Sequence, residues 1–421
     1  MVFLNTDYPA LEQNLLIGCL IQDEPSLVRL TSVAIPTIKY LIMKQTVCVA
    51  TFEGPKTHPT IQHVPRPKPG PRAALIKIEA CGVCGTDLHI LKGHWPKPLP
   101  WPLTLGHELA GVIEEIGESL TQDFMGNPLQ PGDRIMLPPL MSCGECDYCV
   151  HYPAHANRCL NPTYYGRYIP FEKPPHLWGG WAEMVYVDLD LFPATKIYRL
   201  PDSLSSMMGS LTEPLTCCIR AINRAIGVGG FSVGDTVVIQ GSGPIGLLSL
   251  VAAREMGAGR VLVVGAPETP RLSLCREFGA DATVCLDDHD TPQKRIARIR
   301  DLVGNYGADL VIDCSGHPSA GPEGIEMLRD GGTYVEMGQF TDVGSVETNW
   351  HRICSKDINL LGSWAFTPND IALGIGMMSR IANRYPWQQM QTPFPFSASG
   401  IQQAIATAMN MECLKAVIVP H

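Results

Sequence analysis

The chain has 421 residues, of which 45% are apolar and 17% charged, and its formal net charge at pH 7 is −9. This length predicts two domains with packed interiors and excludes a small scaffold held together by disulfides. The negative charge is thinly spread without a basic stripe, so a small molecule is expected as partner, and neither nucleic acid nor a membrane. The low charged fraction predicts a homodimer or homotetramer, because part of the surface would be buried against another subunit.

The segment 1–42 differs from the rest of the chain. Its apolar stretch 15–21 is too short to span a bilayer, and no Lys or Arg precedes it, so neither a membrane helix nor a secretory signal is predicted. A regular pattern begins near Thr46, three residues after Met43. We therefore expect residues 1–42 to be a disordered extension or the result of a start codon placed too early.

Short apolar runs dominate the chain up to about residue 212. Over residues 47–79 they are broken by the proline-rich segment 64–71, a pattern typical of strands joined by rigid turns. Glycine-punctuated runs at 107–116 and 133–138 continue this pattern. We predict a β-rich domain over residues 43–212.

Four cysteines stand close together in the run CGECDYCVHYPAHANRC, namely Cys143, Cys146, Cys149 and Cys159. This spacing predicts a zinc site in the loop 143–159, in which the protein fills all four tetrahedral positions and leaves none for a substrate. A disulfide pair or an iron–sulfur site is the alternative, without other support in the sequence. The remaining cysteines are scattered, as in a reducing compartment, which predicts a cytoplasmic location.

Beyond about Leu211, apolar strands alternate with helices, the rhythm of a parallel sheet covered by helices. The pattern predicts a doubly wound α/β domain over residues 213–363, with strands at 236–240, 261–264, 308–313 and 333–337, and helices at 244–256 and 271–278. The last part, 364–421, is expected to hold one amphipathic helix at 401–409 and a strand at 416–419, and to return to the first domain.

The run VVIQGSGPIGLLSLVAAREMGA has Gly241, Gly243 and Gly246 in the order G-x-G-x-x-G, directly after a predicted strand and at the start of a predicted helix. Gly241 permits the tight turn, Gly243 lets the backbone approach a pyrophosphate, and Gly246 allows the helix to pack closely on the strand. With Pro244 and Ile245, these residues are predicted to bind NAD or NADP.

The acid that usually binds the adenosine ribose, about 20 residues beyond such a loop, is missing, because Gly265 ends the second strand. Arg271 could pair with the 2′-phosphate of NADP, whereas Glu268 could replace the missing acid and favour NAD. Arg271 could equally be a solvated helix residue, so the sequence does not decide between the two cofactors.

A second group of metal-binding residue types stands in CGVCGTDLH and LGHELAG, where Cys84, His107 and Glu108 occur. Taken singly, such residues are more often a core cysteine and a solvated turn. Together, sulfur, nitrogen and oxygen donors are typical of a catalytic zinc, which keeps three protein ligands and leaves one position open for water or substrate.

These motifs, with EPL at 213–215, resemble in order and spacing those of the zinc-dependent medium-chain dehydrogenases, the alcohol and polyol dehydrogenase superfamily, over about residues 46–419. The resemblance implies a GroES-like catalytic domain, a Rossmann domain that binds NAD or NADP, one structural and one catalytic zinc, and transfer of a hydride between an alcohol or polyol and the nicotinamide. Zinc-free quinone or enoyl reductases and non-catalytic dinucleotide-binding proteins of this fold are the alternative.

The resemblance also implies roles for single residues. Cys84 and His107 match ligands of the catalytic zinc, and Glu108 matches a ligand or near neighbour of it. Glu213 matches the third ligand of the sorbitol-dehydrogenase-like branch, and Cys217, one helical turn later, is its rival. Two further residues match the family's proton relay from the alcohol to solvent, Thr86 and His89.

The interval between Cys149 and Cys159 is longer than is usual in the family, so His151 or His155 could replace a cysteine as zinc ligand. The substrate is not readable from the sequence. Three tryptophans could line a pocket for a bulky alcohol or serve as packing anchors, namely Trp95, Trp101 and Trp178.

Overall fold

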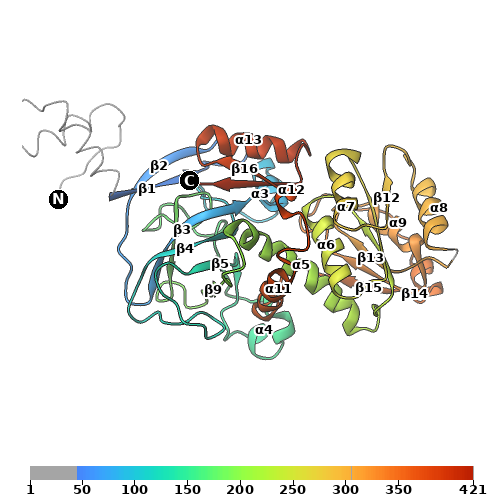
Figure 1. Cartoon of the computed structure of the whole chain (residues 1–421), viewed down its shortest axis with the longest axis horizontal. Coiled ribbons are helices and arrows are strands. Elements are labelled where there is room, and N and C mark those ends of the chain that lie inside the picture. Colours follow the sequence, from blue (N-terminus) through green and yellow to red (C-terminus); the bar gives the residue numbers. More distant parts are fainter. Residues whose placement is uncertain (1–44, 305, 421) are drawn as a thin grey trace, which may run out of the picture. The chain divides into compact units, whose positions relative to one another are not determined.

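The computed structural model describes residues 45–304 and 306–420. From Thr46 onward they belong to one compact unit, which contains two large sheets and two smaller sheets of two strands each (Figure 1). The expected extension 1–42 lies outside the described residues. Within the described ranges, no helix combines the length and apolar character needed to cross a bilayer.

The first sheet combines strands from both ends of the compact unit. At its centre, β3 (Ala73–Gly82) pairs antiparallel with β4 (Glu108–Ile116), β8 (Met184–Asp188) and β17 (Lys415–Val419). Its main path runs β16-β17-β3-β4-β5-β9, which includes β16 (Gln391–Pro395), β5 (Arg134–Leu137) and β9 (Tyr198–Arg199). The pairing of β17 with β3 brings the last described strand beside the segment CGVCGTDLH.

Smaller elements flank this sheet. The strands β1 (Thr46–Thr51) and β2 (Thr60–Pro65) pair with each other, as do β6 (Leu140–Met141) and β7 (Thr163–Tyr164). Between β6 and β7 the cysteine loop carries the short helix α4 (Asp147–Val150) and a 3-10 segment, Pro153–Arg158. The loop therefore leaves and rejoins the domain at one place.

The second sheet is parallel throughout and has the order β12-β11-β10-β13-β14-β15. Its strands are β10 (Thr236–Gln240), β11 (Arg260–Gly265), β12 (Ala282–Cys285), β13 (Ala308–Asp313), β14 (Leu328–Glu336) and β15 (Asn359–Gly362). In sequence order this is the 3-2-1-4-5-6 arrangement of dinucleotide-binding folds, whose ligand crevice opens where the order reverses, between β10 and β13.

Helices cover the second sheet, namely α6 (Pro244–Glu255), α7 (Ser273–Glu277), α8 (Pro292–Val303) and α9 (Ala320–Met327), whereas α10 (Trp350–Ser355), which has no buried residue, precedes β15. The long helix α5 (Ser206–Gly227) contacts β3 and β4 of the first sheet as well as α6 and α11 (Pro368–Ile381), so it joins the two sheets (Figure 1). Its buried Leu211 and Leu215 share one apolar core with Ala110 of β4 and Val237 of β10.

Most predicted strands of the second sheet are confirmed, β10 and β13 with their predicted bounds. The helix predicted at 271–278 is wrong at its start, because Glu268–Leu272 forms a π turn and α7 begins only at Ser273. The single helix expected in 364–421 is also wrong, because α11 and α12 (Trp387–Met390) precede α13 (Ala398–Met409). Gly374 and Gly376 weaken the helical signal of α11, but Gly374 is needed where that helix meets Thr216 of α5.

Candidate active site and metal centres

The four sulfur atoms of the cysteine loop converge on one point. Cys146 Sγ lies 3.5 Å from Cys149 Sγ and 3.8 Å from Cys159 Sγ, and Cys143 Sγ lies 4.0 Å from Cys149 Sγ. A tetrahedral zinc with Zn–S bonds of about 2.3 Å requires sulfur separations of about 3.8 Å. A disulfide needs about 2.05 Å, and all four residues are free cysteines, so the donor set fits zinc.

Backbone groups of the loop support thiolates at this site. The N–H groups of Cys143, Cys146 and Leu160 donate to sulfur atoms of the cluster at 3.2–3.4 Å. The bond from Leu160 is the main cause that lowers the pKa of Cys146 to about 6. His151 bonds to Asp147 instead, so the structure gives no reason for a histidine to replace a cysteine.

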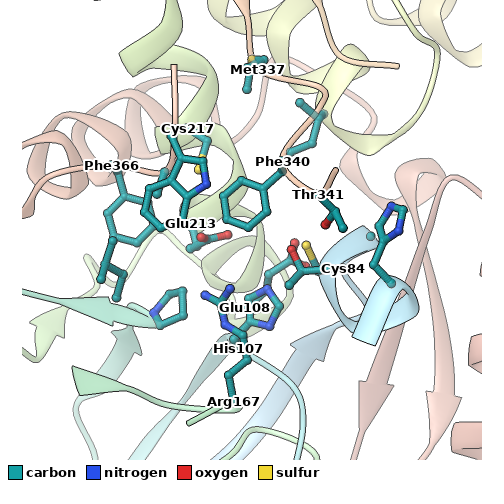
Figure 2. A pocket seen from close by; sticks show the side chains of 18 of the residues that line it. Cys84, His107, Glu108, Arg167, Glu213, Cys217, Met337, Phe340, Thr341 and Phe366 are labelled. Carbon is teal, nitrogen blue, oxygen red and sulfur yellow. The ribbon is translucent and has the colours of Figure 1, made fainter. Parts of the chain in front are cut away.

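A cavity of about 160 Å³ contains the second group of predicted residues (Figure 2). It is lined by every residue predicted for the catalytic zinc and the relay, namely Cys84, Thr86, His89, His107, Glu108 and Glu213, and by Cys217. Other lining residues follow β14 and β15 of the parallel sheet, such as Phe340 and Trp364. Both sheets therefore contribute to one pocket.

The strand register explains why Cys84 and His107 meet. Gly82 pairs with Glu108, so the residues just beyond this pair reach the same end of β3 and β4. The fully buried Asp87 then connects the two segments: its carboxylate accepts from the Cys84 N–H at 3.0 Å and lies 3.1 Å from His107 Nδ1. A histidine that donates through Nδ1 keeps Nε2 free for a metal.

Glu213 projects from α5 into the pocket beside these residues (Figure 2). It forms no ion pair with a cation of the described chain, and burial, then the Glu108 carboxylate, raise its pKa to about 7. The rival Cys217 is a thiol whose pKa is raised well above its ordinary value by burial and then by Glu213. Glu213 is therefore the better anionic donor of the two.

Glu108 is engaged elsewhere. Its carboxylate is fully buried and forms an ion pair with Lys415, which is 2% exposed and begins β17. The Cβ of any larger residue at Gly82 would collide with this carboxylate and would lie 2.8 Å from Lys415 Cε. The ion pair favours Glu108 as a neighbour of the metal position and Glu213 as the ligand.

Only the four-cysteine group brings its donor atoms within 4.8 Å of one another among the described residues. The sulfur, imidazole and carboxylate donors of the pocket are therefore more widely spaced than those of the loop. Their chemistry still fits a divalent cation, because the buried Glu213 carboxylate forms no ion pair within the described chain and His107 is oriented by Asp87.

Thr86 and His89 lie on α3 (Gly85–Lys92), which begins after Cys84 as its N-cap. Thr86 is therefore inside the first turn and does not cap the helix. The Nδ1 atom of His89 is buried without a hydrogen-bond partner. Burial, then Lys92 and His94, lower the pKa of His89, so its ring is neutral and able to accept a proton at neutral pH.

The expected tryptophans do not line this pocket. Trp178 is 1% exposed and packs edge-on against Phe192, while Trp101 packs against the apolar core of the first domain. Trp364 takes their place and stacks on Phe340 with ring centroids 4.9 Å apart. Trp364 could not be singled out from the sequence, because the loop that carries it matches no motif.

The glycine loop has the geometry that its motif predicts. Gly241 has φ +111°, and a Cβ there would lie 2.8 Å from the backbone carbon of Cys314, which follows β13. Gly243 is the N-cap of α6, and Nη1 of Arg271 lies 3.7 Å from the position that a Cβ would take there. The helix N-terminus and the adjacent guanidinium therefore both favour an anion, as a dinucleotide requires.

The three residues considered for cofactor choice have different surroundings. Gly265 ends β11, and a side chain there would collide with Ser242 of the glycine loop. Glu268 forms an ion pair with Arg276. Arg271 is partly buried, and its Nε has no hydrogen-bond partner among the described residues.

Comparison with known proteins gives consistent results over nearly the whole described chain. A model described as alcohol dehydrogenase GroES-like domain matches residues 70–202, and one described as zinc-binding dehydrogenase matches residues 244–380. Sorbitol dehydrogenase of Halalkalibacterium halodurans is 32% identical over 315 residues, which cover 74% of this chain and 82% of that protein. The 5-exo-hydroxycamphor dehydrogenase of Pseudomonas putida is 30% identical, with coverage of 84% and 94%.

Solved structures agree. The crystal structure of an alcohol dehydrogenase from Thermotoga maritima has a TM-score of 0.80 at 27% identity and covers 89% of this chain and 100% of that one. The chain therefore belongs to the zinc-binding alcohol dehydrogenases of the medium-chain superfamily, with a GroES-like and a Rossmann domain. It is an oxidoreductase that transfers a hydride between an alcohol and a nicotinamide cofactor, and the zinc-free alternative is not supported.

Proposed function

We propose that this enzyme oxidises a small polyol or related secondary alcohol with a catalytic zinc held by Cys84, His107 and Glu213 and a structural zinc in the loop 143–159. The buried, unpaired Glu213 carboxylate in the pocket is the observation that carries this proposal. A glutamate here is the mark of the polyol branch, and sorbitol dehydrogenase is among the relatives. A cavity of about 160 Å³ favours a compact substrate.

When bound, zinc would lower the pKa of the alcohol, and the nicotinamide would take up the hydride. Asp87 holds His107 in one orientation. Thr86, which lines the pocket, accepts the hydroxyl proton of the substrate, and the neutral His89 relays it through its unpartnered Nδ1. Phe340 and Trp364 exclude water from the reacting carbon, because their stacked rings cover one wall of the pocket.

Metal analysis and a substrate panel test this function. We expect two zinc ions per chain, and activity with small polyols that disappears when a chelator removes the less tightly held ion. Kinetics with secondary alcohols and polyols of three to six carbons would identify the substrate. A protein that holds a single zinc, oxidises none of these alcohols and reduces a quinone with NADPH would contradict the proposal.

We further propose NADP as the preferred cofactor. No acid ends β11, Glu268 forms an ion pair with Arg276, and Arg271 lies beside the glycine loop without an ion pair in the described part of the chain. This arrangement is favourable for a 2′-phosphate, and the end of β11 provides no carboxylate for a free 2′-hydroxyl.

Replacement of Arg271 by alanine is therefore expected to raise the Kd of NADPH by a factor of about 10 to 100, the usual value of a charge-assisted hydrogen bond. The Kd of NADH should change less than threefold. Fluorescence titration of both cofactors measures these constants. An equal loss of affinity for the two cofactors would place Arg271 at the pyrophosphate that they share. If the affinity for neither cofactor fell, Arg271 would lie outside the cofactor site.

Assembly into a homodimer or homotetramer stays a prediction. One edge of the parallel sheet supports it. Strand β15 is the last of the parallel sheet in the described chain, and its Leu360 is 44% exposed. Trp350 of the nearby α10 is 71% exposed. An edge strand with exposed apolar neighbours is a suitable surface for pairing with a second copy.

A further inference from the structure

Arg167 is a buried arginine that forms no hydrogen bond or ion pair within the described chain. It is 5% exposed, lines the catalytic pocket together with His107 and Glu213, and follows β7 in the first domain. Its Nε is buried without a hydrogen-bond acceptor, and within the described chain its guanidinium forms no ion pair. Figure 2 shows the side chain extending from beside His107 toward the centre of the cluster. A buried guanidinium without an acceptor is costly, so an acceptor that enters the pocket, on a ligand or as water, stabilises it.

Aromatic rings hold this guanidinium in place. Its carbon lies 5.1 Å from the ring centre of Tyr164 and 5.5 Å from that of Trp95. Trp95 is itself fixed, because its Nε1 donates to the hydroxyl of Tyr168 at 2.8 Å. Cation–π contacts orient a guanidinium through its faces and leave its N–H groups at the edge free for hydrogen bonds.

The other charges around the pocket already have partners or an assigned role. Asp87 is bonded to His107 and to the Cys84 N–H, and Glu108 is paired with Lys415. Glu213 is assigned to the metal. Arg167 influences Asp87 and Glu213 electrostatically, but it makes a hydrogen bond with neither. Because Arg167 lines the pocket and no hydrogen bond or ion pair within the described chain involves its guanidinium, its N–H groups are available to a substrate there.

We propose that Arg167 binds an anionic substituent of the alcohol substrate, a carboxylate or a phosphate, and so determines substrate specificity. Arginine is suited to this task, because its planar N–H groups match two oxygen atoms of such a group at once. The inference rests on the proposed function and narrows it: the preferred substrate is an alcohol that carries a negative charge a few bonds from the hydroxyl.

The test compares three compounds of similar size, namely glycerol, glycerate and glycerol 3-phosphate. Calorimetric titration of the zinc-loaded enzyme without cofactor measures binding, and steady-state kinetics measures kcat/KM. We expect at least one anion to bind 10 to 100 times more tightly than glycerol, the range of charge-assisted hydrogen bonds. Arg167→Gln should abolish that advantage and change the Kd of glycerol less than threefold, whereas Arg167→Lys should retain part of it.

Arg72→Gln is the matched control, because Arg72 is half exposed, pairs with Asp190 and does not line the pocket. A preference for glycerol 3-phosphate alone would identify a phosphate, and a preference for glycerate alone a carboxylate. Equal affinity of the unaltered enzyme for all three compounds would overturn the role of Arg167. An Arg167→Gln variant that loses as much affinity for glycerol as for the anions would overturn it as well. The proposed function is tested separately, by whether the unaltered enzyme oxidises neutral polyols.

Discussion

Replacement of Glu213 by glutamine is expected to lower kcat/KM by about 10³-fold or more, which corresponds to about 4 kcal/mol of lost transition-state stabilisation. Glutamine keeps the size of the side chain but removes the negative charge. The carboxylate is buried in the pocket and forms no ion pair within the described chain, although Lys415 and Arg167 act on it from a distance, so its charge is available for a metal. Zinc content should fall from two ions per chain toward one, as measured by plasma mass spectrometry.

The control for this experiment is Cys217→Ser, one turn further along the same helix and in the same pocket. Burial raises the pKa of this thiol far above its ordinary value, so we expect its loss to leave zinc content unchanged and activity within about tenfold. The opposite result, in which Cys217→Ser loses the metal and Glu213→Gln retains it, would assign the ligand to the thiol.

The sequence predicted those parts of the structure that local pattern determines. The glycine motif between an apolar strand and a helix predicted the dinucleotide fold, and Gly241 indeed has the positive φ that the turn requires. The cysteine spacing predicted a cluster whose sulfur atoms do converge. Both motifs are short, and each is held together by neighbours along the chain.

Contacts between distant segments could not be predicted in this way. Lys415 meets Glu108 only because β17 pairs with β3, although a lone lysine in the apolar run ECLKAVIVP is a signal that could have been noticed. Arg167 appears ordinary in sequence. Its importance depends on burial between rings from separate loops, and only three-dimensional packing reveals that it has no acceptor.

Removal of one thiolate from the cysteine loop should affect stability more than chemistry. We expect Cys146→Ser to lose one zinc per chain and about 3 to 6 kcal/mol of stability, less than the roughly 10 to 16 kcal/mol by which zinc stabilises isolated zinc-finger peptides. The expected loss of stability is smaller than in those peptides because other hydrogen bonds hold the loop. Ser142 Oγ donates to the carbonyl of Ala156, and Arg220 of α5 donates to the carbonyl of Ala154. Calorimetry and zinc analysis measure both effects.

The structural effect of Cys146→Ser should be confined to the cysteine loop. Cleavage by a protease is expected within 143–159, since three thiolates and the remaining hydrogen bonds cannot hold the loop closed, while the pocket keeps its metal and at least a tenth of its activity at low temperature. Cys354→Ser is the control, because Cys354 is exposed on α10 and far along the chain from either donor group. If Cys146→Ser retained both zinc ions and the melting temperature of the unaltered enzyme, the convergence of the four sulfur atoms would not reflect a structural metal. If it lost all activity with its stability intact, the loop would belong to the chemistry and not to the support of the fold.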